Sequence, residues 1–358
     1  MYDRQADRWF ISEFTNAPNG LLIAVSDTPD PLGTYTSYVY GTPDSFPDYP
    51  HYSIMGDTYY CASNKSGEKA YAFNRGKMLA GDATAEMVGF NLPGMIQNGF
   101  AAPQPINSEG ITPVPAGEDG IIVYYQDDAW GGVAQDHIKI WTIDPDWTTP
   151  ANSTISGPVE VNTSPFDSEF VSFGGFANLE QPGTSQRIDA IQGAVMYMAQ
   201  FYDFGTHHSM IFNFPVDLNS NTVSGIRWME FRRNNYADAW TLFQESTFYD
   251  PVAADATSAV NSVFMGGMGM DAQGNIALAY TKTGPNAPDF PSLFYTGRFS
   301  SDPLGQMTVA EELIEAGTTS VTSNDRYGDY GQLTLDPTDD LTFWYTAEYS
   351  GQPRRTRV

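Results

Sequence analysis

The stretch Asn324–Ser350, NDRYGDYGQLTLDPTDDLTFWYTAEYS, reads as a loop, a strand, a tight turn and a second strand. Gln332–Leu335 alternates polar and apolar residues, as a half-buried strand does. Asp336–Asp340, DPTDD, is typical of a turn, because Pro fixes φ and Asp side chains bond their own backbone. Leu341–Tyr349 is rich in β-branched and aromatic residues and alternates again. The stretch therefore predicts a hairpin.

The same pattern recurs along the chain in a weaker form. Strands that end in turns rich in Asp, Pro, Asn or Gly are predicted at Leu21–Asp27, Ala70–Lys77, Ile138–Asp144, Ser209–Asp217, Ser292–Ser300 and, cut short, Arg354–Val358. A more apolar strand comes before each of them, at Arg8–Phe14, Thr58–Ser63, Gly120–Gln126, Ala194–Tyr202, Asn275–Thr281 and Leu341–Tyr349. Weaker strands typical of sheet edges follow most of them; examples are Tyr35–Tyr40, Gly157–Val161 and Gly225–Arg232. Met307–Ala316 fits either a short helix or an edge strand.

Four-stranded units repeated about six times are typical of a β-propeller. The sequence therefore predicts an all-β fold, a single β-propeller domain over residues 1–358. The Asp-Pro-Leu-Gly sequence at both Asp30–Gly33 and Asp302–Gly305 supports the repeat. The first unit lacks an obvious first strand and the last stops after its third. We therefore expect either six blades that close imperfectly or a seven-bladed parent whose N-terminal unit is missing here.

Composition excludes several classes of function. The 358 residues carry a net charge of −26, and such a surface repels nucleic acid and anionic lipid. No apolar run approaches the ~20 residues of a membrane helix, so no membrane insertion is expected. Cys61 is the sole cysteine, which permits no intrachain disulfide, and we expect it to be a small buried hydrophobe. The start of the chain is not a signal peptide, so any export signal would lie outside this sequence.

Five segments resemble a poorly characterised group of large secreted bacterial proteins whose propeller domain is loosely sialidase-like. The group's motifs RWGDY and DPxxDxxFWxxxEY correspond here to RYGDY at 326–330 and DPTDDLTFWYTAEY at 336–349. The resembling segments are Tyr2–Phe14, Leu21–Tyr35, Phe264–Thr281, Ser292–Met307 and Arg326–Ser350. The resemblance implies a propeller located outside the cell or on its surface, and it implies no particular reaction. Asn261–Phe264 departs from the group, which tends to have Arg before the Met-Gly pair.

Candidate site residues come from the segments that lead into the first strand of each blade, because these line the funnel of a propeller. The candidates are Asp48, His51, Gln104, Arg187, Asp189, Asn261, Arg326 and Asp329. Asp48, Asp189 and Asp329 are the candidate catalytic residues, since paired carboxylates can protonate a glycosidic oxygen and activate water. The alternative is that Arg326 and Asp329 form a structural ion pair that holds the last loop.

Two further signals lie in predicted loops. Trp130 and Trp147 are candidate ligand-binding residues because aromatic faces stack on sugar rings; the alternative is packing between blades. No cofactor is required, and Ca²⁺ is the one ion that the acidic loops suit. Its candidate ligands are Asp127, Asp128, Asp336 and Asp339, and each fits ordinary turn chemistry equally well.

Three functions follow from these observations. The first hypothesis is an extracellular module that binds a polysaccharide or another extracellular polymer. The second is a glycoside hydrolase or polysaccharide lyase that uses the funnel carboxylates. The third is a structural or adhesive surface scaffold. A sialidase is not predicted, because the sequence lacks the Asp-box turns of that family, and no GxSxG, HExxH or phosphate-binding loop is present.

Overall fold

The structure is a computed structural model of the chain, and it describes residues 1–170, 176–218, 222–351 and 354–358. Nearly all regular structure in these ranges is β-strand. The helical elements described are α1 (Arg75–Leu79) and the short 3-10 helices η1 (Pro150–Asn152) and η2 (Ala256–Ser258). None of the described helices has the length and apolar character that spanning a bilayer requires.

The strands of the described ranges form six antiparallel sheets. Short antiparallel sheets that follow one another along the chain are the blades of a β-propeller, so the predicted fold class is confirmed. The chain divides into two compact units. The first unit comprises Met1–Met95, Ala101–Tyr124 and Lys139–Glu160; the second comprises Ile96–Phe100, Tyr125–Ile138 and Val161–Val358.

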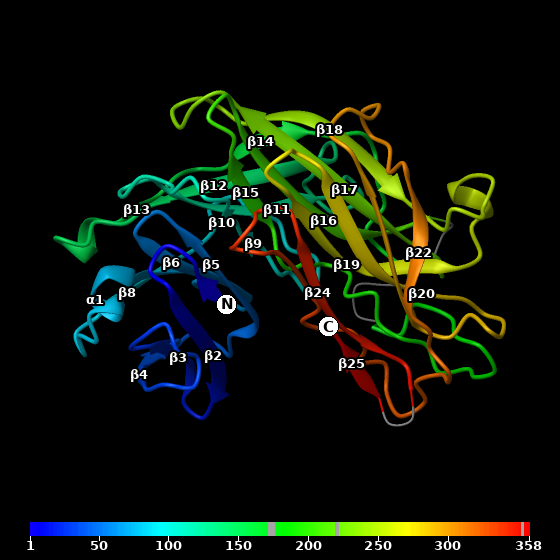
Figure 1. The fold of residues 1–358 in the computed structure, drawn as a ribbon, viewed down its shortest axis with the longest axis horizontal. Helices are drawn as coiled ribbons and strands as arrows, with labels where there is room; N and C mark the ends of the chain where they lie inside the picture. Colours follow the sequence, from blue (N-terminus) through cyan, green and yellow to red (C-terminus); the bar gives the residue numbers. More distant parts are fainter. Residues whose placement is uncertain (171–175, 219–221, 352–353) are drawn as a thin grey trace. The chain divides into compact units, whose positions relative to one another are not determined.

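Two sheets lie wholly in the first unit, and in each of them consecutive strands pair with one another (Figure 1). One sheet has the strands β1 (Tyr2–Asp3), β2 (Arg8–Asn16), β3 (Asn19–Ser26) and β4 (Tyr35–Gly41). The other has β5 (Asp48–Met55), β6 (Thr58–Asn64), β7 (Ala70–Asn74) and β8 (Met87–Phe90). Their core includes Phe10, Leu21, Tyr59 and Phe73, together with Cys61, which is fully buried as expected.

A third sheet has the strand order β13-β12-β11-β9, and β14 also pairs with β12. The strands of this sheet are β9 (Gln104–Pro105), β11 (Gly120–Gln126), β12 (His137–Asp144), β13 (Thr154–Ile155) and β14 (Val159–Asn162). The short strand β10 (Asn107–Glu109) lies between β9 and β11 in the sequence and is not part of this sheet. β11 is buried along its whole length, which explains why it reads as a nearly continuous apolar run.

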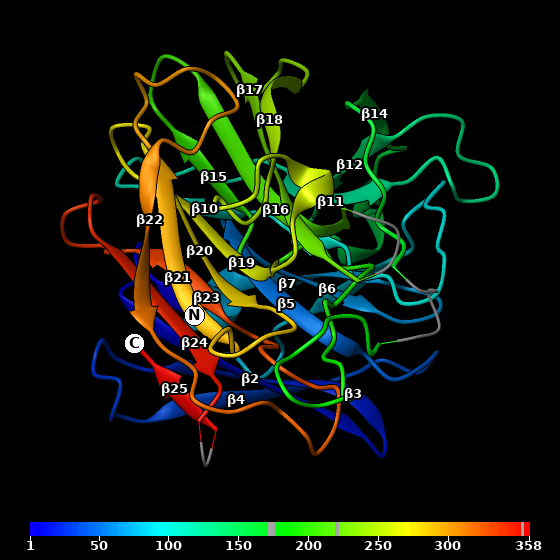
Figure 2. The same ribbon diagram turned by 90° about the vertical axis from the view of Figure 1, so that its right-hand side faces the viewer.

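Three groups of strands belong to the second unit. The first consists of β15 (Gln200–Asp203), β16 (His208–Asp217), β17 (Ser224–Arg233) and β18 (Thr241–Phe248). The second consists of β19 (Ser262–Met270), β20 (Ile276–Thr283), β21 (Ser292–Arg298) and β22 (Val309–Glu315), of which β20, β21 and β22 run side by side in Figure 2. The third consists of β23 (Gln332–Leu335), β24 (Phe343–Tyr349) and β25 (Arg355–Arg357).

The hairpin predicted at 332–349 is confirmed, since β23 pairs with β24 from Gln332↔Thr346 to Leu335↔Phe343. Met307–Ala316 proves to contain an edge strand, β22. The strand predicted at Ala70–Lys77 ends earlier, at Asn74. The reason is local: the Asn74 side chain accepts a hydrogen bond from the Lys77 backbone N–H at 3.1 Å and begins α1.

The strand predicted at Ala194–Tyr202 is shorter than expected, because β15 begins only at Gln200. The residues before it are buried in irregular chain, where the apolar content that suggested a strand serves the core instead. That irregular chain contains Asp189.

Candidate functional site

Asp189 lies in the buried irregular segment that precedes β15, and its side chain has no exposed surface. Its backbone N–H donates to the Asp325 carbonyl at 2.9 Å, which ties the segment to the loop before β23. Its Oδ1 accepts a hydrogen bond from the Ile191 backbone N–H at 2.7 Å. Its Oδ2 is buried and has no hydrogen-bond partner among the described residues. An ionised carboxylate with a free buried oxygen is costly, so this environment favours the protonated form.

The pKa of Asp189 is shifted in the direction that its buried position predicts. Burial raises the pKa of Asp189 to about 7; the hydrogen bond from Ile191 opposes the shift and the negative charge of Asp329 adds to it. The positive charge of Arg326 acts in the opposite direction and is a smaller effect. A carboxyl group with such a pKa gains and loses its proton in the range where most enzymes work. Asp189 therefore changes its protonation state near neutral pH.

Asp329 and Arg326 accompany Asp189 in the second unit. The Arg326 Nη1 lies 4.0 Å from the Asp329 Oδ2, and the two side chains are 58% and 24% exposed. The Arg326 guanidinium carbon also lies 5.4 Å from the centroid of the Phe176 ring. An ion pair so long and so exposed adds little stability. Arg326 is thus open to a ligand, whereas Asp329 is partly exposed with a buried Oδ1; the structural and the functional roles raised from the sequence both stay predictions.

Two residues beside these carboxyl groups have a positive φ. Ile191 has φ 53°, and Tyr330, which follows Asp329, has φ 68° and a side chain that is 51% exposed. A β-branched residue in this region is strained, and such strain collects at functional sites. Neither position carries a sequence signal, because nothing in the side chain of Ile or Tyr favours a positive φ.

In the first unit, His51 and Gln104 pair with each other. His51 is on β5 and Gln104 on β9, so both lie on strands and not on the loops that the sequence suggested. His51 Nδ1 and Gln104 Oε1 are 2.9 Å apart, and both side chains are buried. Burial lowers the pKa of His51 to about 4, against a smaller opposing effect of the Gln104 hydrogen bond, so the ring is neutral at physiological pH. The third carboxylate candidate, Asp48, accepts a hydrogen bond from Asn64 Nδ2 at 3.3 Å.

The remaining polar candidates have local partners. Arg187 Nη2 lies 3.0 Å from Glu180 Oε1, and both side chains are partly exposed. Asn261 packs so closely against Gly284 that a Cβ there would lie 2.0 Å from its Oδ1. These contacts account for the two residues as parts of the local structure.

The two Trp candidates are less exposed than the sequence suggested. Trp130 is 2% exposed and packs near Tyr125, so the expectation of an exposed aromatic surface at this position is wrong. Its loop folds back onto the core because its backbone N–H donates to the Asp127 carbonyl and closes a turn. Trp147 is partly buried, and its Nε1 donates to Thr58 Oγ1 at 2.9 Å.

The acidic residues chosen for calcium divide into two kinds. Asp127 and Asp128 come together with Asp136, which the sequence did not suggest, and the three offer carboxylate oxygens within 4.8 Å of one another. Asp127 and Asp136 already accept backbone N–H groups on both oxygens, among them those of Ser168 and Phe166. Calcium binding at this cluster stays a prediction.

Asp336 and Asp339 instead stabilise the turn between β23 and β24. Asp336 accepts hydrogen bonds from Thr338 and from Trp344 Nε1, and Asp339 accepts them from the backbone of Leu341 and from Thr342. All four carboxylate oxygens of the pair are thus engaged by groups of the hairpin itself. This is the turn chemistry that the sequence offered as the alternative.

Comparisons with known proteins add little to this picture. No protein-family model matches the chain, and no curated protein matches its sequence. The membership of the secreted bacterial group therefore stays a prediction. Solved structures that match the chain include an endo-1,4-β-xylanase from Bacteroides thetaiotaomicron, with a TM-score of 0.36 and 9% identity over 87% of this chain and 92% of the xylanase chain.

Two further solved structures are similar at the same level. One is an α-L-arabinofuranosidase from Clostridium thermocellum, with a TM-score of 0.34 and 11% identity over 84% of this chain and 92% of the other. The other is a xylan β-1,4-xylosidase from Bacillus halodurans, with a TM-score of 0.24 and 12% identity over 77% of this chain and 59% of the other. Similarity this low transfers no activity, so the functional argument has to come from the site itself.

Proposed function

We propose that the chain is a carbohydrate-active protein that hydrolyses glycosidic bonds, with Asp189 as the general acid and Asp329 as the second carboxylate. The observation that carries the proposal is the pairing of a buried carboxyl group, whose pKa burial raises to about 7, with a partly exposed carboxylate close enough to raise it further. Glycoside hydrolases use such a pair, one group protonated and the other ionised.

The reaction balances with these two groups and one water molecule. Asp189 gives its proton to the glycosidic oxygen while the bond from that oxygen to the anomeric carbon breaks. The anomeric carbon is then attacked either by water, whose proton passes to Asp329, or first by Asp329 and afterwards by water. The products are a free hydroxyl group and a new reducing end. In the first route Asp329 then releases its proton to solvent and Asp189 takes one up from solvent; in the second route Asp189 takes the proton of the attacking water directly, and the Asp329 ester bond breaks.

The surroundings supply means of binding a sugar. Arg326 is exposed and can donate to hydroxyl or carboxylate oxygens, and Phe176 lies close to its guanidinium group. Tyr330 offers a half-exposed aromatic ring next to Asp329 on which a sugar ring can stack. A polysaccharide is a substrate found outside cells, which fits the location expected from the sequence.

The second candidate is binding of a polysaccharide without turnover. The observation that favours it is the complete burial of Asp189, which a general acid must leave to reach its substrate. In that case Arg326, Asp329 and Tyr330 would form the binding surface, and Asp189 would only support them.

A screen of the purified chain against soluble polysaccharides, with calcium present, separates these candidates. Under the proposal, new reducing ends appear with at least one polymer and are lost in Asp189→Asn and in Asp329→Asn. Asp255→Asn is the matched control, because Asp255 is an exposed cap of η2. Retardation in affinity gels without reducing ends would favour the binding module. If no polymer gives either new reducing ends or retardation, both candidates are contradicted and the scaffold hypothesis remains.

A further inference from the structure

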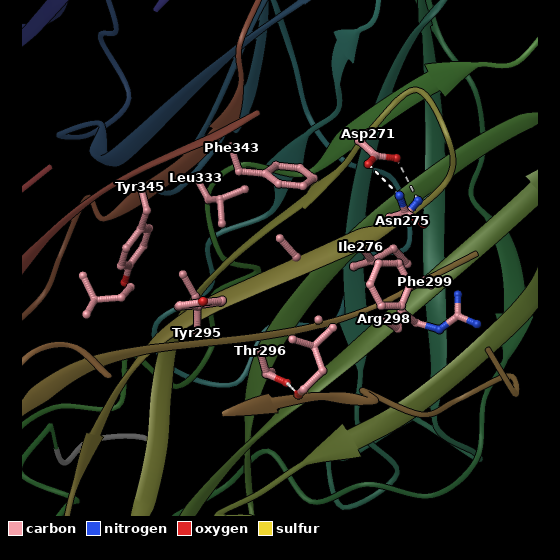
Figure 3. Close-up of a pocket in the computed structure, with 15 residues that line it drawn as sticks. Asp271, Asn275, Ile276, Tyr295, Thr296, Arg298, Phe299, Leu333, Phe343 and Tyr345 are labelled. Atoms are coloured by element: carbon pink, nitrogen blue, oxygen red, sulfur yellow. Dashed lines mark hydrogen bonds between the residues drawn. The ribbon is translucent and has the colours of Figure 1, made fainter. Parts of the chain in front are cut away.

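An apolar cleft of about 430 Å³ lies in the second unit, and none of the residues assigned above is among its described lining residues. One wall is the sheet of β20 and β21, and the other is the hairpin of β23 and β24 (Figure 3). Ligand pockets of small molecules start at about 300 Å³, so the cleft has room for a molecule of one or two rings.

The cleft arises because the sheet carries small residues on the face that the hairpin covers. Gly267 and Gly269 on β19 pair with Ala279 and Ala277 on β20. The hairpin fills the space over the two glycines, since a Cβ on Gly269 would lie 2.4 Å from Leu333 Cδ2. Ala277 and Ala279 line the cleft that remains, and their methyl groups are too short to fill it.

Aromatic rings line both walls. Tyr295 and Phe299 on the sheet side are 42% and 56% exposed, and Phe343 and Tyr345 belong to the hairpin. Edges and faces of such rings pack best against another flat ring, at centroid separations of about 4.5–7 Å. The lining therefore selects a flat, apolar occupant.

Asp271 and Thr296 at the rim are already engaged by the protein. Asp271 accepts hydrogen bonds from the backbone and side chain of Asn275, as the dashed lines in Figure 3 show. Thr296 Oγ1 donates to the Val309 carbonyl at 2.7 Å. Arg298 Nη2 donates to the Asp302 carbonyl at 2.9 Å, whereas its buried Nε has no hydrogen-bond partner among the described residues. The space between the aromatic rings is lined mainly by apolar groups, and the Arg298 guanidinium group points away from those rings in Figure 3, so an occupant between the rings should be neutral.

Tyr345 on the hairpin also lines the cleft. Its hydroxyl group is buried and has no hydrogen-bond partner among the described residues. A buried hydroxyl left in this state is unfavourable, and a ligand that accepts or donates one hydrogen bond would relieve it. Burial raises the pKa of this hydroxyl above its usual value, so it stays a donor at neutral pH.

We propose that this cleft binds a neutral aromatic molecule of one or two rings, with a hydrogen bond to the Tyr345 hydroxyl. The evidence is independent of the Asp189 site and of the reaction proposed for it. The chemistry identifies an aryl compound with a single oxygen or nitrogen function, such as a phenol.

The test uses the whole chain with 2-naphthol and naphthalene as probes, followed by fluorescence titration. One saturable site for 2-naphthol is expected per chain. Ala277→Leu extends a lining side chain into the cleft and should weaken binding roughly tenfold or more. Ala272→Leu makes the same change at an exposed position in the β19–β20 turn and should leave the affinity unchanged. Tyr345→Phe should weaken 2-naphthol about three- to tenfold and leave naphthalene unaffected.

Several results would overturn the proposal. These are the absence of 2-naphthol binding, or equal binding by wild type and a folded Ala277→Leu variant. If circular dichroism shows that Ala277→Leu does not fold, Tyr345→Phe decides, and an unchanged affinity for 2-naphthol then contradicts the proposed hydrogen bond. A concentration-dependent dimer that Ala277→Leu abolishes would show that a second copy of the chain, not a small molecule, occupies the cleft.

Discussion

Asp189 in the second unit and His51 in the first are both buried polar side chains, and burial acts on them in opposite directions. It raises the pKa of Asp189 to about 7 and lowers that of His51 to about 4, because in each case it disfavours the charged form. Each side chain has one short hydrogen bond, His51 Nδ1 with Gln104 Oε1 and Asp189 Oδ1 with the Ile191 backbone N–H, so the sign of the shift follows from the charge of the ionised form. His51 is thus neutral throughout the working range of pH, while Asp189 changes its charge within that range. Burial alone makes a polar residue structural; titration near pH 7 beside a second carboxylate makes it a candidate for chemistry.

The largest expected effect is on turnover. Asp189→Asn keeps the size of the side chain and removes its acidic proton, so we expect a loss of about 10²- to 10⁴-fold in the rate of reducing-end release. The corresponding change at His51, His51→Gln, should reduce the rate far less, because a neutral buried ring has no proton to give at pH 7. Equal losses in the two variants would remove the distinction drawn between the two sites.

A second prediction concerns the stability of the wild-type chain. Because the pKa of Asp189 is raised from 3.8 to about 7, the folded state binds a proton that the unfolded state releases between these values. Its contribution is fully present below about pH 4 and is lost as pH rises through 7, by up to about 4 kcal/mol. Asp189→Asn should remove that loss, so urea unfolding at pH 8 should show a variant more stable than wild type. A variant that is less stable at pH 8 and has an unchanged pH slope would contradict this.

His51 should give a slope of the opposite sign. Its pKa is lowered from 6.5 to about 4, so its contribution is fully present above about pH 6.5 and is lost as pH falls towards 4. The loss amounts to up to about 3 kcal/mol. His51→Gln should flatten the wild-type decline between pH 6.5 and 4 in the same unfolding experiment, whatever its effect on stability at pH 7. Persistence of the full decline would mean that other groups cause it.

The smallest effect expected is a shift of the pH profile. Asp329 raises the pKa of Asp189, so Asp329→Asn should lower that pKa and stabilise the ionised form of Asp189 at a lower pH. The pH midpoint of the stability loss assigned to Asp189 should therefore move down. Asp255→Asn, which changes an exposed carboxylate elsewhere, should leave the midpoint in place. If the midpoint does not move in Asp329→Asn, the two carboxyl groups do not interact electrostatically, which would contradict the proposed pair.

Much of the fold could be predicted from the sequence, because alternation and turn residues act locally. The Asp336–Asp340 turn and its two strands are an example, and the side chains of Asp336 and Asp339 cap the turn in the expected way. The candidate site was harder to predict from the sequence than the fold. Asp189, Arg326 and Asp329 were among the candidates and interact electrostatically, whereas Asp136 was missed and Trp130 was misplaced on the surface. Burial and long-range contacts decide these cases, and neither leaves a pattern within a few residues of sequence.

The backbone of the site was also beyond prediction. Ile191 and Tyr330 adopt a positive φ although their side chains disfavour it. The Asp189 backbone N–H in the same region donates to the Asp325 carbonyl, a contact between segments far apart in the sequence. Local sequence statistics point the other way, so only the folded structure identifies these positions.

The most direct test of the account is the pKa of Asp189 itself. Carbon-13 NMR of a chain labelled at the Asp carboxyl carbons follows each group through a pH titration, and the Asp189 signal is the one that Asp189→Asn removes. The account predicts a midpoint near pH 7 for that signal, moving down in Asp329→Asn. A midpoint near the ordinary value of 3.8 would mean that Asp189 is an ordinary ionised carboxylate, and the proposed acid would then have no proton to donate.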